Sequence, residues 1–449
     1  MSNSLQAGFG RAVITPPMGT EISGYFVTRI ADGVLDDLEI NAIALRAGGD
    51  TVVMMSYDLC SVVTATADLI RTQVSEALGI PRAAVVVAAD HTHTGPFSTP
   101  GKEEGGLQRQ YYRFLLEQSL AAAKAAVADL KPARMGWKVG LAPNIAFVRR
   151  FRMKDGGVRT NPGVGNPDIV APIGDVDERV GVLRFTREGA EDIVLVNFGN
   201  HPDTVGGCKI SADWPGFLRR TLEKTLDDTK CVFFNGAEGD VNHVNVWAKD
   251  GDYNDLFMDF DDVARGYGHT RFMGRCMAGA VLQVYDKVNY VDVDSLRYAD
   301  STVKLPSNMP TAEELVQARV YNELHKAGKD EQIPFKGMEL TTVVAEAGRM
   351  VNLANGPEAF PLNMAAVAIG PVALVAIAGE PFTGIGRGIK DTEGWDLIMP
   401  LCNANGREGY FPMQEAYDEG GYEARSSVFK AGVAEKIIAE GKRLLKEVQ

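Results

Sequence analysis

The sequence contains no long apolar segment and few cysteines. No stretch approaches the roughly 18 consecutive apolar residues of a membrane-spanning helix. The five cysteines are scattered and form no CxxC pair: Cys60, Cys208, Cys231, Cys276 and Cys402. Thiols in this pattern are typical of a reduced cytosolic protein rather than a disulfide-bonded one. Because Met1 to Gln6 is also too short and polar for a signal peptide, we expect a cytoplasmic protein.

Positive charge is scarce as well. Lysine and arginine number 46 against 59 aspartates and glutamates, which gives a formal net charge of −13. Nucleic acids and anionic membranes require a basic surface, so we expect neither as the main partner. The hydrophobic fraction of 45% is ordinary for a globular protein. Because no fixed repeat or low-complexity linker divides the chain, we expect a single domain over residues 1–449.

Two common catalytic motifs are missing. The sequence has no GxSxG, which argues against a nucleophilic serine hydrolase of that kind. The segment GFGRAVI near the start lacks the third glycine that a dinucleotide-binding fingerprint needs before its helix.

Apolar, strand-like runs alternate with helical segments along the chain. Strands are expected at residues 83–89, 193–198, 231–234 and 397–402, and hairpins at residues 43–59 and 364–378. Helices are expected at residues 66–78, 111–130, 214–226, 311–329 and 427–448, of which 311–329 is charged enough to be a surface insertion. The first hairpin turns at Gly48 and Gly49, and the first helix ends at Gly79. This alternation predicts an α/β (α+β) fold with mixed β-sheets flanked by helices.

Polar side chains follow the expected strands at the points where the strands end. These residues are His91, His93, His201, Asp240, His243 and Glu380. Ligands of open α/β sheets gather beyond strand ends, so loops there can build a site on a rigid scaffold. Four of the six histidines lie in these loops, and neutral imidazole is a common zinc ligand. The pattern therefore favours a metal site in loops at strand ends.

The motif DHTHTGP adds a geometric constraint. In an extended segment residues i and i+2 point the same way, so His91 and His93 can face one pocket. One of them could bind the metal while the other handles protons. His93 could equally be a hydrogen-bond donor that orients a ligand.

Six motifs together resemble the catalytic domain of the neutral (alkaline, non-lysosomal) ceramidase family. They are GFGRAVITPP with GY, DHTHTGP, NFGNHP, the GDV of GAEGDVNH, AGEPFT, and NANGREGYFPMQEAYDEGGYEARSS. They occur in family order from Gly8 to Ser427, so the resemblance covers nearly the whole chain. It implies a zinc-dependent hydrolase of linear amide (N-acyl) bonds, with a small-molecule or lipid-like substrate.

The resemblance also implies a set of zinc ligands. The family's ligand positions fall on His91, His201, Glu380 and Tyr410. The residues alone support the histidines and the glutamate, whereas the tyrosine rests on the resemblance. Four such ligands leave room for a water molecule, as a catalytic zinc site requires.

Three further positions are implied to act on the substrate. His93 matches a histidine beside the metal-activated water, and Tyr422 matches a tyrosine of the substrate pocket. Arg149 of FVRRFR matches an arginine that contacts substrate, although Arg150 fits an alternative register. Asp240 is either a structural residue behind the site or an aspartate that caps a turn.

The sequence also departs from the family pattern. FPMQEAY replaces the usual TT-x-EEY run, residues 153–168 form a polar loop without an apolar rim, and no C-terminal β-sandwich domain is expected after the terminal helix. These departures keep two alternatives open. One is a metal hydrolase of the same scaffold that acts on a small polar amide, lactam or ester. The other is a metal-binding protein without catalysis.

Overall fold

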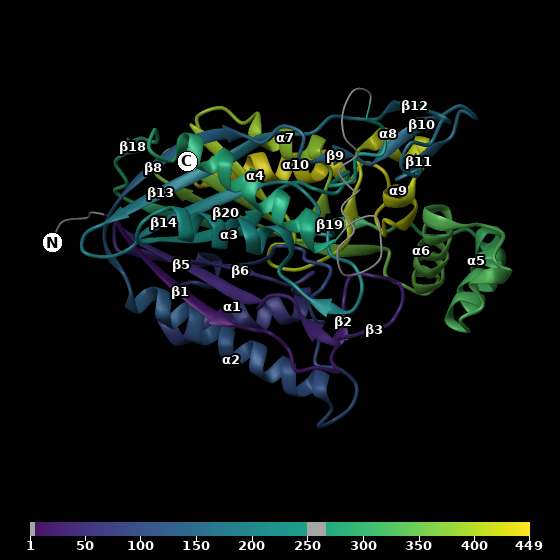
Figure 1. Ribbon diagram of the computed structural model, residues 1–449, viewed down its shortest axis with the longest axis horizontal. Helices are drawn as coiled ribbons and strands as arrows, with labels where there is room; N and C mark the ends of the chain where they lie inside the picture. Colours follow the sequence, from purple (N-terminus) through teal and green to yellow (C-terminus); the bar gives the residue numbers. More distant parts are fainter. Residues whose placement is uncertain (1–4, 249–265) are drawn as a thin grey trace.

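The computed structural model describes residues 5–248 and 266–449. Two β-sheets lie face to face at its centre (Figure 1). The first has the order β16-β14-β13-β8-β1-β5-β6-β7, with β18 beside β8, and the second the order β19-β20-β21-β23. Their bounds are β1 Gln6–Val13, β5 Glu39–Ala47, β6 Asp50–Tyr57, β7 Val85–Ala89, β8 Lys131–Leu141, β13 Arg179–Arg187, β14 Asp192–Phe198, β16 Thr229–Asn235, β18 Asn289–Val291, β19 Leu296–Pro306, β20 Ala359–Ile369, β21 Val372–Ile377 and β23 Leu397–Leu401.

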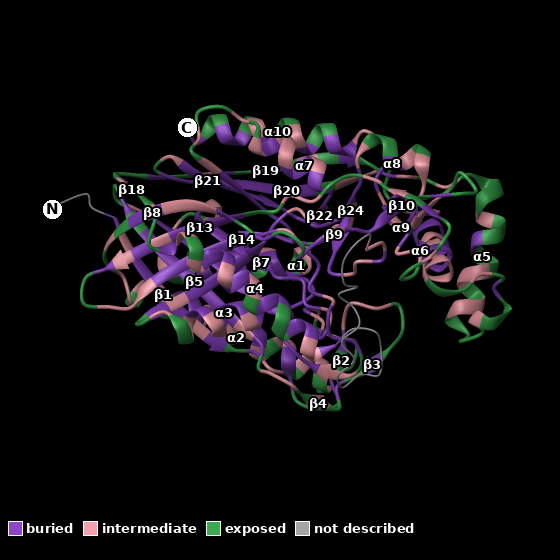
Figure 2. Cartoon of the chain, turned by 45° about the horizontal axis from the view of Figure 1, so that its top comes forward, coloured by how far each residue is buried: buried purple, intermediate pink, exposed green. Residues whose placement is uncertain are grey.

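Helices cover the outer faces of both sheets. They are α1 Thr64–Leu78, α2 Leu107–Ala128, α3 Asp213–Thr225, α4 Tyr267–Tyr285, α7 Thr383–Lys390 and α10 Val433–Glu447. The pairs α1/α2 and α3/α4 pack on the two halves of the first sheet, and α7/α10 pack on the second. The strands are buried while α10 exposes one face (Figure 2). The predicted α/β fold of mixed sheets flanked by helices is confirmed.

Shorter elements line the loops. They are β2 Glu21–Ile22, β3 Arg29–Ile30, β4 Gly33–Val34, β9 Phe147–Val148, β10 Arg150–Met153, β11 Val158–Thr160, β12 Ile169–Pro172, β15 Lys209–Ile210, β17 Val241–Asn242, β22 Glu380–Pro381, β24 Tyr410–Phe411, α8 Gln414–Glu419, α9 Tyr422–Ser426, and the 3-10 turns Arg82–Ala84 and Asp330–Gln332. Two longer helices, α5 Ala312–Lys326 and α6 Gly337–Leu353, form a hairpin beside α9 at one end of the molecule (Figure 1). Among the described residues, no helix is both long and apolar enough to cross a membrane.

The main core lies between the two sheets. Leu45, Leu183 and Val232 of the first sheet pack there with Val367 and Leu374 of the second, and each is at most 1% exposed. Fully burying one such side chain contributes about 1.5–3 kcal/mol. This apolar layer stabilises the strands from which the site loops emerge.

Gly8 and Gly10 of GFGRAV allow helix α2 to approach strand β1 closely. A Cβ added at Gly8 would lie 2.1 Å from the carbonyl oxygen of Ala126, and one at Gly10 would lie 2.2 Å from that of Ala122. Any side chain at either position would therefore push α2 away from β1. This structural role fits the absence of a nucleotide-binding fingerprint.

Most expected elements occur within a few residues of their predicted bounds. The first hairpin turns at Gly48 and Gly49, with φ of 63° and 97°, and α1 ends at Gly79, with φ of 64°. The predicted helix start at residue 427 is wrong, because α10 begins only at Val433. Gly432 adopts φ of 93° before it, and Phe429 is buried in a β-bridge to Ser307.

A buried ion cluster ties α3 to the ends of two strands. Arg219 Nη2 lies 2.6 Å from Asp58 Oδ2, just after β6, and its Nη1 lies 3.9 Å from Asp90 Oδ2, just after β7. The three side chains are at most 2% exposed. Because Asp90 immediately precedes His91, this cluster fixes the start of the DHTHTGP loop.

We expect Arg219→Met to lower the free energy of unfolding by about 3–5 kcal/mol, because it leaves the buried Asp58 carboxylate without its cation. The matched control is Arg220→Met, whose guanidinium is 35% exposed and 3.2 Å from Asp36. That change should cost less than about 1 kcal/mol. Urea unfolding of both variants measures the difference, and equal losses would contradict the role of the cluster.

Candidate metal centre and active site

The site forms where the ends of parallel strand pairs meet. The strands β7, β14, β16, β21 and β23 each belong to a parallel pair, and the loops that follow them carry the polar residues. The segment Cys402–Asn405, just after β23, lies between the edge strands of the first sheet. Its Cys402 N–H donates to the carbonyl of Asn235 (3.0 Å), its Asn403 carbonyl accepts from Ala89 N–H (3.1 Å), and its Asn405 N–H donates to Val87 (2.6 Å).

His91 and His201 present the same ring nitrogen to the site. His91 Nδ1 lies 2.7 Å from the carbonyl oxygen of Cys60. His201 Nδ1 lies 3.0 Å from the carbonyl oxygen of Val241 and 3.1 Å from that of Glu238. In this arrangement each Nδ1–H donates to a backbone carbonyl, which leaves the Nε2 lone pair free to bind a metal.

Glu380 and Tyr410 enter the site side by side. They are register partners in the parallel pair β22/β24. Glu380 Oε2 lies 3.5 Å from Nε2 of His91 and 3.5 Å from Nε2 of His201, and Tyr410 Oη lies 3.4 Å from His201 Nε2. Oε2 is buried and has no hydrogen-bond donor among residues 5–248 and 266–449. A buried carboxylate oxygen that faces two imidazole lone pairs fits a bound cation.

The charges around the histidines favour a cation as well. Burial lowers the pKa of His91, but Glu238, Glu380 and Cys60 outweigh it, so the pKa is raised well above its ordinary value. Burial would raise the pKa of Glu380, but His91 and His201 hold it well below its usual range. Glu380 is therefore ionised in the site.

A second grouping shares one of these histidines. Ligand atoms of Cys60, His91 and His93 lie within 4.8 Å of one another, as do those of His91, His201 and Glu380. His91 Nδ1, which is 3.8 Å from Cys60 Sγ, already donates to the carbonyl of Cys60. The grouping with Glu380 is the one whose ligand atoms remain available.

His93 lies beside the ligands without joining that grouping. Its Nε2 is 3.1 Å from His91 Nε2, and its Nδ1 is 3.8 Å from Asp203 Oδ1. Gly24, with φ of 108°, makes room for the ring, since a Cβ there would lie 2.9 Å from His93 Cγ. Burial and the two neighbouring histidines lower the pKa of His93, although Asp203 opposes them. The ring is neutral and can accept a proton.

Of the two candidate arginines, Arg149 faces the site. Its Nη1 lies 3.4 Å from His201 Nε2, its Nε lies 2.7 Å from Glu423 Oε1, and its guanidinium sits 5.2 Å from the centre of the Tyr410 ring. Arg150 points elsewhere, to Glu419 at 3.1 Å.

Tyr422 stands at the open side of the site. Its ring lies 5.5 Å from the Tyr410 ring and 6.3 Å from the Phe26 ring, measured between centroids. A cleft of about 510 Å³ runs from Glu380, Tyr410 and Tyr422 toward the α5–α6 hairpin. The structure thus brings all seven predicted site residues together: His91, His93, Arg149, His201, Glu380, Tyr410 and Tyr422.

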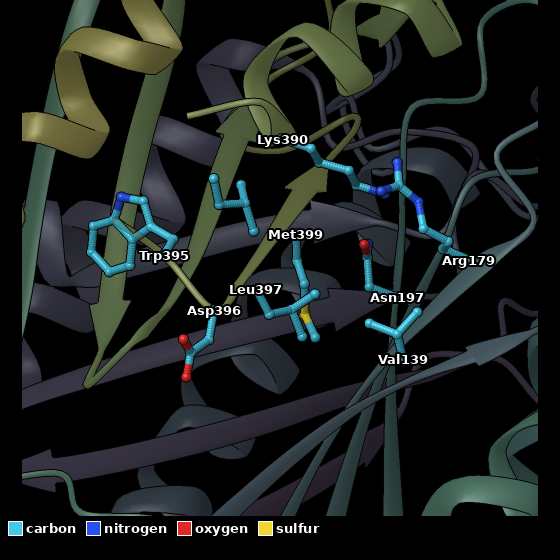
Figure 3. Close-up of a pocket in the computed structure, with 10 residues that line it drawn as sticks. Val139, Arg179, Asn197, Lys390, Trp395, Asp396, Leu397 and Met399 are labelled. Atoms are coloured by element: carbon cyan, nitrogen blue, oxygen red, sulfur yellow. The ribbon is translucent and has the colours of Figure 1, made fainter. Parts of the chain in front are cut away.

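A separate cavity of about 140 Å³ lies between β13, β14 and β23 (Figure 3). Its lining includes Arg179, Lys390 and Trp395, and no histidine or cysteine is found among the described residues that line it. Arg179 and Lys390 both bind Asp177, at 2.7 and 2.9 Å. The cavity therefore offers no comparable metal chemistry.

Two loop residues from the sequence pattern lie outside the metal grouping. Asp240 Oδ1 accepts from both the N–H (2.7 Å) and the hydroxyl (2.8 Å) of Thr383, so it anchors the start of α7. His243 is buried with its ring 5.7 Å from that of His269.

Sequence reasoning missed two buried residues behind the ligands. Glu238 accepts hydrogen bonds from Asn235 (2.5 Å), Cys402 (3.1 Å) and Asn403 (3.2 Å). Asn403 in turn lies 3.2 Å from His91 Nδ1. Glu238 follows β16 in GAEGD, so the strand-end rule could have found it.

We expect Glu238→Gln to weaken metal binding about 10- to 100-fold, because the neutral amide removes a negative charge that favours a cation. The new side-chain NH2 group can also face the NH2 group of Asn235, so that two donors meet. Competition with a chelator measures the affinity. Glu419→Gln, which changes a half-buried carboxylate outside the cluster, is the control and should keep the affinity of the unaltered protein. Unchanged metal affinity in Glu238→Gln would show that the Glu238 carboxylate does not contribute to metal binding.

The comparisons with known proteins find similar structures but no similar sequence. The chain matches no protein-family model and no curated protein sequence. Neutral ceramidase from Pseudomonas aeruginosa superposes with a TM-score of 0.71 at 17% identity, over 100% of this chain and 75% of that one. A structure of ceramidase complexed with C2 also gives 0.71, at 16% identity, over 100% of this chain and 76% of that one. The resemblance seen in the motifs is thus confirmed in the fold: the chain has the architecture of a neutral ceramidase catalytic domain.

Proposed function

We propose that this protein is a zinc-dependent hydrolase of linear amide (N-acyl) bonds. The ligands are His91, His201, Glu380 and Tyr410. The observation that carries the proposal is the convergence of two Nε2 lone pairs on the unpartnered Oε2 of Glu380, with both Nδ1 atoms turned to backbone carbonyls. Nitrogen and oxygen donors of this kind suit zinc.

The residues around the ligands supply the rest of the chemistry. Zinc, when bound, lowers the pKa of a water molecule toward neutrality and polarises a carbonyl group. His93 takes the proton of the attacking water and returns it to the leaving amine. Asp203, 3.8 Å from its Nδ1, places a negative charge that stabilises the imidazolium that forms. Arg149 and Tyr422 border the site as donors to the developing oxyanion.

Arg149 is well placed for that role. Its charge is fixed, because burial is outweighed by Tyr410 and Glu423, which raise its pKa. Its Nη2 donates to the carbonyl of Gly239 at 2.8 Å, so the planar group is held rigidly beside His201. A preorganised donor costs no reorganisation when charge develops on the substrate.

Two alternatives differ from this proposal: one has another substrate, and the other has no catalytic activity. The first is a small polar amide, lactam or ester, which suits polar residues of the cleft such as Asn322 and Asn352, although Phe26, Phe360 and Val428 line it too. Activity without detergent distinguishes this substrate class. A metal-binding protein without catalysis is the second alternative. It is disfavoured because His93 and Tyr422 are retained at the site, and a zinc-loaded protein inert toward amides and esters would support it.

We further propose that residues 1–449 act as one catalytic unit. The shared core between the sheets supports this, since it joins residues of the first and last thirds of the chain. The five thiols, all free, support the cytoplasmic location.

We expect the purified protein to bind about one zinc ion per chain, and His91→Ala or His201→Ala to lose it. Each change removes one of the four proposed ligand side chains. His325→Ala alters a histidine of the same cleft outside the grouping and should keep the metal. Elemental analysis checks the set. Full zinc occupancy in both His91→Ala and His201→Ala would contradict the assignment of these histidines as ligands.

We expect His93→Ala to retain zinc and lose about 10²- to 10⁴-fold in the rate of amide hydrolysis. An activated ester, whose leaving group needs no proton, should be affected less. Zinc content and the two rates are measured on the same preparation. Metal loss would make His93 a ligand, and equal damage to both substrates would assign the proton transfer to another group.

A further inference from the structure

The cleft beside the proposed metal ligands has a wall that carries two arginines, although Glu380 and Glu408 line the cleft as well. The wall is formed by α5, α6 and the segment before Tyr410, and Arg349 and Arg407 both line it. Figure 1 shows the α5–α6 hairpin standing beside α9, which carries Tyr422. The wall therefore faces any molecule that reaches the ligands through this cleft.

Arg407 brings a positive charge to the cleft. Its side chain is exposed, and among the described residues it forms no ion pair or side-chain hydrogen bond. Its backbone N–H donates to Thr64 Oγ1 at 3.3 Å. The adjacent acid, Glu408, accepts from the same Thr64 hydroxyl at 2.5 Å and is thus engaged elsewhere.

Arg349 is buried but bound only by neutral groups. Its Nε donates to the carbonyl of Arg425 (2.9 Å) and its Nη1 to that of Asn308 (2.7 Å). The acids near it are already used: Glu346 pairs with Arg425 at 2.6 Å, and Glu314 caps α5. A guanidinium with only carbonyl partners keeps its full charge, and its field extends into the cleft.

Glu380 attracts Arg407 electrostatically, but the two form no ion pair among the described residues. Arg149 is paired with Glu423 at 2.7 Å, and Glu380 faces the two histidines. A guanidinium at the edge of a cleft binds carboxylates through charge-assisted, often bidentate hydrogen bonds. A substrate with an anionic group gains that interaction, whereas a neutral substrate leaves the Arg407 guanidinium without a carboxylate in an ion pair.

Resting on the proposed hydrolase function, we infer that the substrate is an amide that carries a carboxylate, and that Arg407 binds the carboxylate in the cleft that Arg349 also lines. Hydrolysis of such a compound breaks the C–N bond: the hydroxyl of water goes to the acyl carbon, and a proton goes to the leaving nitrogen. The carboxylate takes no part in the bond change and serves to position the amide.

The test compares matched compounds on the zinc-loaded protein. One pair is N-hexanoylglycine and N-hexanoylglycinamide, and the other is the monobutylamide of glutaric acid and its terminal primary amide. The pairs place the carboxylate on either side of the scissile amide. We expect kcat/KM to favour the carboxylate compound in at least one pair by about 10- to 100-fold.

The variant Arg407→Gln should remove most of that preference and keep its zinc, because the side chain has no structural partner among the described residues. Arg152→Gln is the control: its guanidinium is 46% exposed, pairs with Glu419 and does not line the cleft. It should keep the preference. Equal rates within both pairs, or a preference that survives Arg407→Gln, would overturn the inference.

The experiment distinguishes a wrong proposed function from a wrong inference about the carboxylate. If the protein hydrolyses none of the four compounds, calorimetry measures their binding instead. Tighter binding of a carboxylate compound that is lost in Arg407→Gln supports the anion site without the hydrolase. Equal affinities within both pairs contradict the anion site.

Discussion

The site depends on three backbone hydrogen bonds made by Cys402–Asn405. They join the end of the second sheet to both edge strands of the first. Asn403 and Asn405 adopt φ of 44° and 61°, a left-handed conformation that asparagine tolerates better than most residues. The backbone can therefore turn between the strand ends while the Asn403 side chain contacts Glu238 and lies near His91. The proposed ligands, which come from distant parts of the sequence, acquire a fixed separation in this way.

The sequence predicts the parts of the site that obey local rules. The rings of His91 and His93 do share one pocket, but His91 has a φ of 79°, so the predicted extended geometry is not the reason. His91, His201 and Glu380 follow apolar strands, as predicted. These rules work because a buried strand ends at a defined edge of its sheet, whatever the rest of the chain does.

The residues that support the ligands could not be predicted in the same way. Glu238 and Asn403 are partners across about 165 residues of sequence, and no local periodicity signals such a contact. The choice between Arg149 and Arg150 depends on which residue begins β10, since neighbouring residues of a strand face opposite sides. The late start of α10 depends on burial of Phe429, a tertiary contact that overrides the helical pattern.

The histidine at position 91 has a left-handed backbone, with φ of 79°. A non-glycine residue in such a conformation costs about 1–3 kcal/mol. Glycine at this position would avoid that cost but would remove the imidazole whose Nε2 faces Glu380. The site and the stability of the fold therefore make opposite demands on residue 91.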